Sequence, residues 1–74
     1  MKKEYFSLVE MVDRENGEQF DFTLEIGLEE IKMRFISVSE FLNDVIYLLF
    51  DYDTNKYVAI LEDEAKIIMV EVEQ

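Results

Sequence analysis

Val45-Ile46-Tyr47-Leu48-Leu49-Phe50 is a run of six apolar residues enclosed by Asp44 and Asp51. Apolar residues stand at both alternating positions of the run, as they do in a strand that is covered on both faces. The β-branched and aromatic side chains favour a strand over the alternative, the second half of a helix. We therefore expect this run to be the central strand of the fold or a contact between subunits.

The residues before this run carry a helix signal. Ser37 followed by Glu40 has the form of a capping box, in which each side chain binds a backbone N–H at the start of a helix. Phe41 and Leu42 continue at helical spacing. The pattern predicts one short helix over Ser37–Asp44.

Two segments further upstream predict a pair of strands. Gln19 to Ile26 alternates strictly between apolar and polar residues, and Ile31 to Phe35 repeats that alternation after a turn at Gly27–Glu30. One face of each strand would be core, and the other would be charged. We expect the acidic residues Asp21 and Glu25 to face the basic residues Lys32 and Arg34 across the two strands.

The N-terminal part of the chain predicts a first hairpin. Glu4 to Val12 mixes apolar residues at both alternating positions, which suits a strand covered partly on both faces. The polar segment Asp13–Glu18 follows and contains Asn16-Gly17. Both of these residues tolerate the positive φ that a tight hairpin turn requires.

The C-terminal part predicts a second hairpin and a closing strand. Asp53–Lys56 is a plausible turn between the central run and a strand over Tyr57–Leu61. Glu62-Asp63-Glu64 is expected to be an acidic turn, and Lys66–Glu73 a final strand because its residues are rich in Ile and Val. An amphipathic helix is the alternative for this last segment; it would align Leu61, Ala65, Ile68, Met69 and Val72.

Together these patterns predict an α+β fold that is mostly antiparallel sheet, with about five to six strands in hairpins and one short helix. The 74 residues form a single domain, since Gly17 and Gly27 are the only glycines and there is no proline to mark a linker. A domain this short leaves little margin of stability. No run of the sequence has the form of a signal peptide or a membrane span, so we expect a cytoplasmic protein.

The composition makes several classes of partner and of chemistry unfavourable. Eighteen acidic residues against seven basic ones give a formal net charge of -11, which makes nucleic acids and anionic membranes unfavourable partners and basic surfaces favourable ones. The absence of cysteine and histidine excludes disulfides, thiolate metal sites and the commonest general base. The sequence also lacks a nucleophile motif and a phosphate-binding glycine loop. We expect no enzymatic activity and no cofactor.

One local pattern suggests a calcium site. Asp51, Asp53, Asn55 and Glu62 stand at the spacing of the oxygen ligands in an EF-hand loop. Lys56 occupies the position where that family has the glycine of its sharp turn, and it adds a positive charge beside the cation. The competing interpretation, a polar hairpin turn, is favoured.

The strongest functional signal is the acidic pattern as a whole. Outward carboxylates at alternate strand positions lie roughly 6.8 Å apart, about twice the axial spacing of phosphates along one DNA strand. Neighbouring strands and turns can supply the intervening charges. The alternative is that the acids serve solubility alone. The residues expected to form such a surface are Glu15, Glu18, Asp21, Glu25, Glu29, Glu30, Asp51, Asp53, Glu62, Asp63, Glu64, Glu71 and Glu73.

As a small folded domain with many outward carboxylates, the chain resembles the phage-encoded acidic DNA mimics. These proteins occupy the nucleic-acid sites of host proteins such as the nucleoid protein HU, RNA polymerase, uracil-DNA glycosylase or CRISPR effectors. The resemblance implies inhibition of a basic DNA-binding protein, with an HU-like protein first among the targets, in the cytoplasm of an infected bacterium. It also implies a possible homodimer. A second expectation from the residues themselves is an interaction module that docks through an apolar face.

Overall fold

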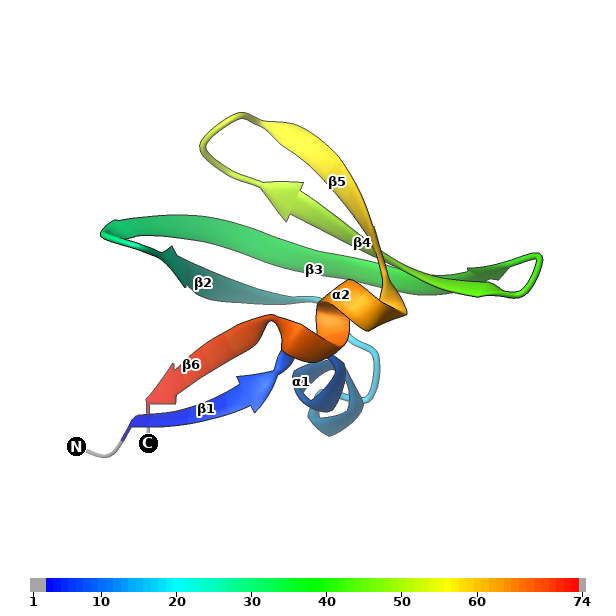
Figure 1. The fold of residues 1–74 in the computed structure, drawn as a ribbon, viewed down its shortest axis with the longest axis horizontal. Helices are drawn as coiled ribbons and strands as arrows, with labels where there is room; N and C mark the ends of the chain where they lie inside the picture. The colour runs from blue at the N-terminus through cyan, green and yellow to red at the C-terminus, as the bar shows by residue number, and fades with distance from the viewer. Residues whose placement is uncertain (1–2, 74) are drawn as a thin grey trace.

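The computed structural model describes the backbone of residues 3–73 and the side chains of residues 4–71, and it confirms the α+β class. Antiparallel strands dominate, and two short helices join them (Figure 1). The elements are β1 (Lys3–Ser7), α1 (Leu8–Arg14), β2 (Phe20–Ile26), β3 (Glu29–Phe41), β4 (Asp44–Asp51), β5 (Lys56–Leu61), α2 (Glu62–Ile67) and β6 (Met69–Glu73).

The larger sheet has the strand order β2-β3-β4-β5, and β1 and β6 form a separate antiparallel pair. β4 lies between β3 and β5, so the expected central position of Val45–Phe50 is confirmed. Its two faces differ. Tyr47 and Leu49 are buried, whereas Ile46, Leu48 and Phe50 on the opposite face are only half-buried. The run is central, but it is covered on one face only.

The core lies between this sheet and a layer made of α1, α2, β1 and β6, which Figure 1 shows on one side of the sheet. We call the covered side the inner face and the other side the outer face. Phe35, Leu8, Leu49 and Val70 are the largest fully buried side chains, and they come from β3, α1, β4 and β6. The core therefore joins elements from both ends of the chain.

The predicted strand over Glu4–Val12 is wrong in its second half, because Ser7 starts a helix. The backbone N–H of Glu10 donates to Ser7 Oγ at 3.1 Å, and Glu10 Oε1 accepts from the Ser7 backbone N–H at 3.4 Å. This is a capping box. It allows Leu8, Met11 and Val12 to lie on one buried face of α1.

The turn at Asn16-Gly17 closes this helix and does not form a hairpin. Both residues have the expected positive φ, 56° and 75°. The Gly17 backbone N–H donates to the carbonyl oxygen of Val12 at 2.9 Å, which satisfies a carbonyl in the last turn of α1. The local conformation was predicted correctly, but the element before it was not.

The predicted helix over Ser37–Asp44 is also wrong. Ser37–Phe41 continues β3 and pairs with Asp44–Leu48 of β4, and the chain reverses at Leu42, whose φ is 59°. A register shift between Phe35 and Ser37 marks a bulge in β3. Pairing with β4 supplies partners for the backbone along this segment, and this outweighs the weak preference of a local capping signal.

Glu62-Asp63-Glu64 is the first turn of α2, and β6 begins only at Met69, so the predicted acidic turn and the length of the last strand are wrong. Carboxylates in a first helical turn are stabilised by the helix dipole. Ala65 is fully buried under the sheet, and Lys66 Nζ lies 3.8 Å from Glu62 Oε1. The short helix thus covers the inner face before the chain turns into β6.

The two leucines at the centre of β4 should differ sharply in their effect on stability. We expect Leu49→Ala to lower the free energy of unfolding by about 2–5 kcal/mol, because it leaves a cavity in the core. Leu48→Ala, on the half-covered outer face, should cost about 1 kcal/mol. Urea unfolding followed by circular dichroism measures both. Equal losses would contradict the assignment of the two faces.

The two Ser-x-x-Glu segments provide a matched test of the capping box. Ser7→Ala should destabilise the protein by about 1 kcal/mol, since it removes an N-cap. Ser37→Ala should change stability by less than about 0.5 kcal/mol, because Ser37 is an exposed strand residue. The same unfolding experiment compares them. A larger loss at Ser37 than at Ser7 would overturn the placement of α1.

Candidate functional site: an acidic end and an apolar outer face

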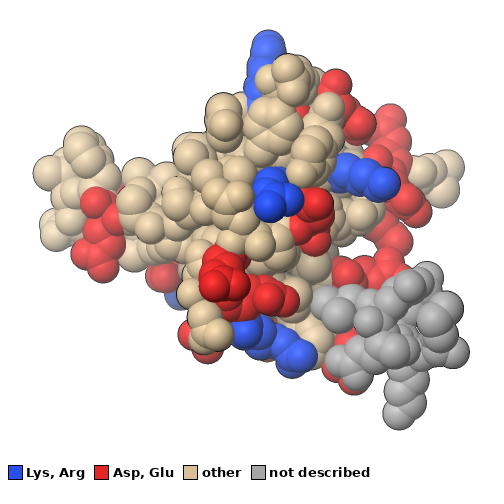
Figure 2. Space-filling view, turned by 180° about the vertical axis from the view of Figure 1, so that it is seen from behind, with Lys and Arg blue, Asp and Glu red and all other residues tan. Residues whose placement is uncertain are grey.

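Five of the predicted acidic residues gather at one end of the larger sheet. The turn between β2 and β3 and the turn between β4 and β5 lie at this end, because β3 begins where β4 finishes. Both turns are on the left in Figure 1, and in Figure 2, seen from behind, acidic side chains gather along the right margin. We call this group the acidic end: Glu25, Glu29, Glu30, Asp51 and Asp53.

The register of the β2–β3 hairpin places two of these carboxylates directly opposite each other. Glu25 pairs with Glu30, and Lys32 pairs with Thr23, so the expected ion pairing of Glu25 with a basic residue directly across the strands is wrong. Directly opposed like charges destabilise a strand pair. Within the described residues, Glu25, Glu29, Glu30 and Asp53 make no ion pair or side-chain hydrogen bond. Their charge is exposed to solvent.

Asp21, in contrast, is engaged within the protein. It lies opposite Arg34, as expected, and its Oδ1 accepts from Arg34 Nη1 at 2.9 Å and from the Tyr52 hydroxyl at 2.7 Å. The hydrogen bond from Tyr52 and the neighbouring Arg34 guanidinium lower the pKa of Asp21 below its usual range. This predicted contact residue therefore ties β2 to β3 and to the β4–β5 turn.

Asp51 and Asp53 shape the turn in which they lie. Asp51 Oδ1 accepts from the backbone N–H of Asp53 at 2.9 Å and from that of Thr54 at 3.4 Å, which fixes the turn, and Asn55 has a φ of 59°. Asp51 is half-buried and Asp53 is exposed. The polar hairpin turn expected at this position is therefore confirmed.

This geometry does not bring the EF-hand positions together. Lys56–Leu61 is an extended strand, so Glu62 lies about 20 Å along the chain from the turn. An EF-hand loop instead folds its twelfth residue back onto the ion. Across the described side chains, no group of three or more acidic residues is placed to hold a metal ion. Asp51, Asp53, Asn55 and Glu62 do not form one site.

The remaining predicted residues lie elsewhere. Glu15 and Glu18 occupy the connection before β2, at the opposite end of that strand from Glu25, and Glu62, Asp63 and Glu64 lie beyond the far end of β5. Glu71 of β6 lines a hollow of about 160 Å³ together with Glu25. The side chain of Glu73 lies outside the described residues. The predicted single acidic surface is thus divided into separate groups.

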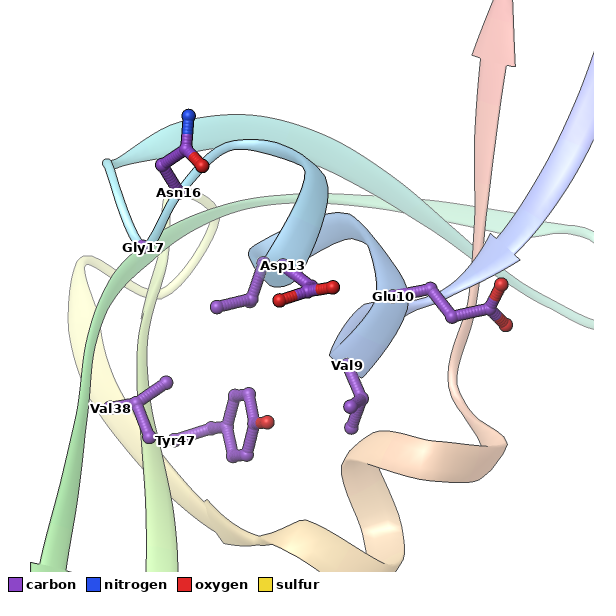
Figure 3. A pocket seen from close by; sticks show the side chains of 8 residues that line it. Val9, Glu10, Asp13, Asn16, Gly17, Val38 and Tyr47 are labelled. Atoms are coloured by element: carbon purple, nitrogen blue, oxygen red, sulfur yellow. The ribbon is translucent and has the colours of Figure 1, made fainter.

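A cleft of about 590 Å³ lies between α1 and the β3–β4 hairpin (Figure 3). Val9, Val38 and Tyr47 face into it, whereas Glu10 points away toward its capping partner. Asp13 remains as the carboxylate of the cleft, and it is exposed. Acid–base catalysis needs two titratable groups with separated pKa values. Besides Asp13 the cleft offers the Tyr47 hydroxyl, but burial raises the pKa of Tyr47, which moves it further from the neutral range that suits a general acid or base.

Sequence reasoning expected an apolar docking face but did not locate it on the outer face of the larger sheet. The half-buried Ile46, Leu48 and Phe50 of β4 adjoin Leu61, Ala59 and Tyr57 of β5, which lie directly across the strand pair and are exposed. The Phe50 ring lies 5.1 Å from the Tyr57 ring and 5.3 Å from the Tyr52 ring. Figure 2 shows a broad uncharged area away from the acidic margin. The signal was present in the sequence, because both alternating positions of β4 and β5 are apolar.

Comparison with protein-family models, with curated proteins and with solved structures gives no match. Neither of the helices described in residues 3–73 is long and apolar enough to cross a membrane. The acidic end, the cleft and the outer face are the surface features of this chain that bear on its function.

The buried Tyr47 gives a prediction for alkaline pH. Burial raises the pKa of Tyr47, and the charges of Glu62 and Asp13 raise it further. A raised pKa in the folded state means that the unfolded chain releases this proton first. The stability that Tyr47 contributes is therefore complete below about pH 10 and is lost as the pH rises above it.

We expect the free energy of unfolding to fall with pH more steeply in the natural chain than in Tyr47→Phe, between about pH 9 and pH 11. Urea unfolding across this range measures the slope. Tyr5→Phe, at an exposed tyrosine, is the control and should keep the natural slope. If Tyr47→Phe showed the same slope of unfolding free energy against pH as the natural chain, the pKa of the Tyr47 hydroxyl would not be raised by folding.

Proposed function

We propose that this chain is a non-enzymatic acidic protein that imitates the phosphate backbone of DNA and occludes the basic nucleic-acid-binding surface of another protein. One observation carries the proposal. Glu25, Glu29, Glu30 and Asp53 are exposed at one end of the larger sheet, and their carboxylates have no cationic partners in the described part of the chain.

The arrangement of Glu25 and Glu30 supports a role in binding over a role in solubility. Two carboxylates opposed across a strand pair repel each other, and scattered surface charges would give the same solubility without this cost. Lysine or arginine side chains of a partner would relieve the repulsion. The acids around α2 differ in this respect, because Glu62 pairs with Lys66 and the whole group stabilises the start of a helix.

The dimensions of the molecule also suit this function. Its longest extent is 41 Å, which equals the axial length of about 12 base pairs of DNA. The molecule is therefore long enough to block a basic groove that binds DNA while the acidic end contacts it.

The partner that fits is a basic DNA-binding protein. An HU-like nucleoid protein is the first to test, and RNA polymerase and CRISPR effectors are further members of the same class. Attraction between a strongly acidic chain and a basic surface accelerates association at low salt and weakens as salt screens it. The mechanism is competition: the protein and DNA would occupy the same surface.

We expect the protein to displace duplex DNA from an HU-like protein, and to do so less effectively as NaCl rises from about 0.05 M to about 0.2 M. Fluorescence anisotropy of labelled DNA measures the displacement. Glu25→Gln combined with Glu30→Gln should weaken it roughly tenfold, since two exposed charge contacts are lost.

Glu15→Gln combined with Glu18→Gln is the matched control, because it removes the same charge from the other side of the molecule. This control should weaken displacement by less than about threefold. If neither HU nor the other basic proteins released DNA, or if displacement did not depend on salt, the proposal would be wrong. Equal effects of the two double variants would show that net charge matters and the acidic end does not.

The second expectation from the sequence, docking through an apolar face, has its counterpart in the outer face. That face contains few carboxylates near β5, so it does not suit the same basic partner. A partner of different chemistry would bind this apolar face.

A further inference from the structure

Among the strands described in residues 3–73, β5 alone contains no acidic residue. Its sequence is Lys56-Tyr57-Val58-Ala59-Ile60-Leu61, whereas each of the other five strands carries at least one Asp or Glu. Eighteen of the 74 residues are acidic, and β5 contains none of them. The exception falls at a particular place in the fold.

That place is an edge of the larger sheet. Within residues 3–73, β5 is hydrogen-bonded to β4 on one side and to no strand on the other. An edge strand presents unpaired N–H and C=O groups to any extended chain that approaches it, and proteins usually protect such edges with charges, proline or bulges. β5 pairs with β4 in an unbroken register and carries Lys56 as its single charge. Lys56, at one end of the strand, is therefore the one protecting charge on this edge.

The outer face beside the edge is apolar as well. Tyr57 is 66% exposed and Leu61 is 46% exposed, and the exposed Ala59 lies between them on the same face. The half-buried Leu48 and Phe50 lie behind them on β4. A strand added to β5 would cover apolar side chains in addition to making backbone hydrogen bonds.

We propose that a second copy of this chain pairs with β5 in antiparallel fashion, so that two four-stranded sheets join into one continuous sheet with a twofold axis at Ala59. In this register Tyr57 lies opposite Leu61 of the second copy, and Val58 lies opposite Ile60. Residues opposed across antiparallel strands share a face, so the exposed apolar residues meet on the outer face and the half-buried ones meet on the inner face.

Charge complementarity favours a second copy of this chain as the molecule that pairs with β5. The same register brings Lys56 to the end of the second copy's β5, beside Glu62, which begins α2 there, and the twofold axis repeats this pair at the other end of the joined strands. Glu62 already lies 3.8 Å from Lys66 in its own chain, and its second oxygen can accept from Lys56. Ala59, the smallest side chain of the strand, stands at the axis, where two identical residues meet.

The net charge of -11 opposes this pairing, and it provides a signature for the test. Two strongly acidic molecules repel each other over distances that salt screens; the screening length falls from about 14 Å at 0.05 M salt to about 4 Å at 0.5 M. Self-association along an apolar edge should therefore tighten as salt rises. Binding of the acidic end to a basic protein should weaken over the same range.

Sedimentation equilibrium of the full chain, at protein concentrations from about 5 µM to about 500 µM, measures the association. We expect a monomer–dimer equilibrium that shifts toward dimer at high salt. Ala59→Glu places two like charges at the twofold axis and should reduce the association constant about tenfold or more. A monomer at every concentration and salt would overturn the proposal.

Ser39→Glu is the matched control, because Ser39 is an exposed residue of β3 and lies on the same outer face, away from the edge. It should leave the dimer intact. If Ser39→Glu disrupted the dimer as strongly as Ala59→Glu, the two copies would be stacking face to face, and the edge pairing would be wrong. Circular dichroism confirms that both variants are folded before they are compared.

A charge exchange tests the register itself. Lys56→Glu should weaken the dimer, and adding Glu62→Lys to the same chain should restore it, because the pair is re-formed with reversed charges. A strand from an unrelated partner would not be rescued in this way. Absence of rescue in a folded double variant would reject the register.

This inference is independent of the proposed function. Ala59→Glu should still displace DNA from a basic protein, since it leaves the acidic end unchanged, and Glu25→Gln with Glu30→Gln should still dimerise. Failure of one experiment therefore leaves the other informative.

Discussion

Phe35 is the residue on which the arrangement of this sheet depends. It pairs with Phe20 of β2 on one side and with Leu49 of β4 on the other, its ring lies 5.4 Å from that of Phe20, and it is fully buried. The bulge directly after it shifts the register of β3. A bulge bends a strand and increases its twist. The first half of β3 can therefore pair with β2, and its second half can pair with β4. The Phe35 side chain contributes to both strand pairs and packs in the core.

The distribution of charge follows from this sheet. Because the outer face has no covering layer in the described structure, it could have carried carboxylates at every alternate position, but it does not. Asp21, Arg34 and Tyr52 form a bonded network over β2 and β3, and the side of the sheet formed by β4 and β5 is apolar. The acids are concentrated at turns and ends. Much of the self-repulsion that comes with a net charge of -11 therefore lies at turns and strand ends, and less of it lies at the centre of the larger sheet.

Two surfaces with opposite chemistry result, and they suit different partners. The acidic end offers carboxylates that lack internal cations, which supports the proposed competition with DNA for a basic surface. The edge formed by β5 offers backbone groups and apolar side chains, which supports pairing with a second copy. The opposite salt dependence expected for these two interactions follows from the same charge: screening removes attraction in the first case and repulsion in the second.

The sequence by itself determined the fold class, the central strand at Val45–Phe50, the strand before Gly27 and the conformation at Asn16-Gly17, because each depends on alternation or on backbone sterics within a few residues. It did not determine which of two Ser-x-x-Glu segments starts a helix. At Ser7 the following residues bury one helical face against the sheet, whereas at Ser37 pairing with β4 satisfies the backbone of an extended chain. The acidic end and the outer face were likewise decided by tertiary structure alone, since strand register sets which side chains share a surface, and register depends on contacts between residues far apart in the chain.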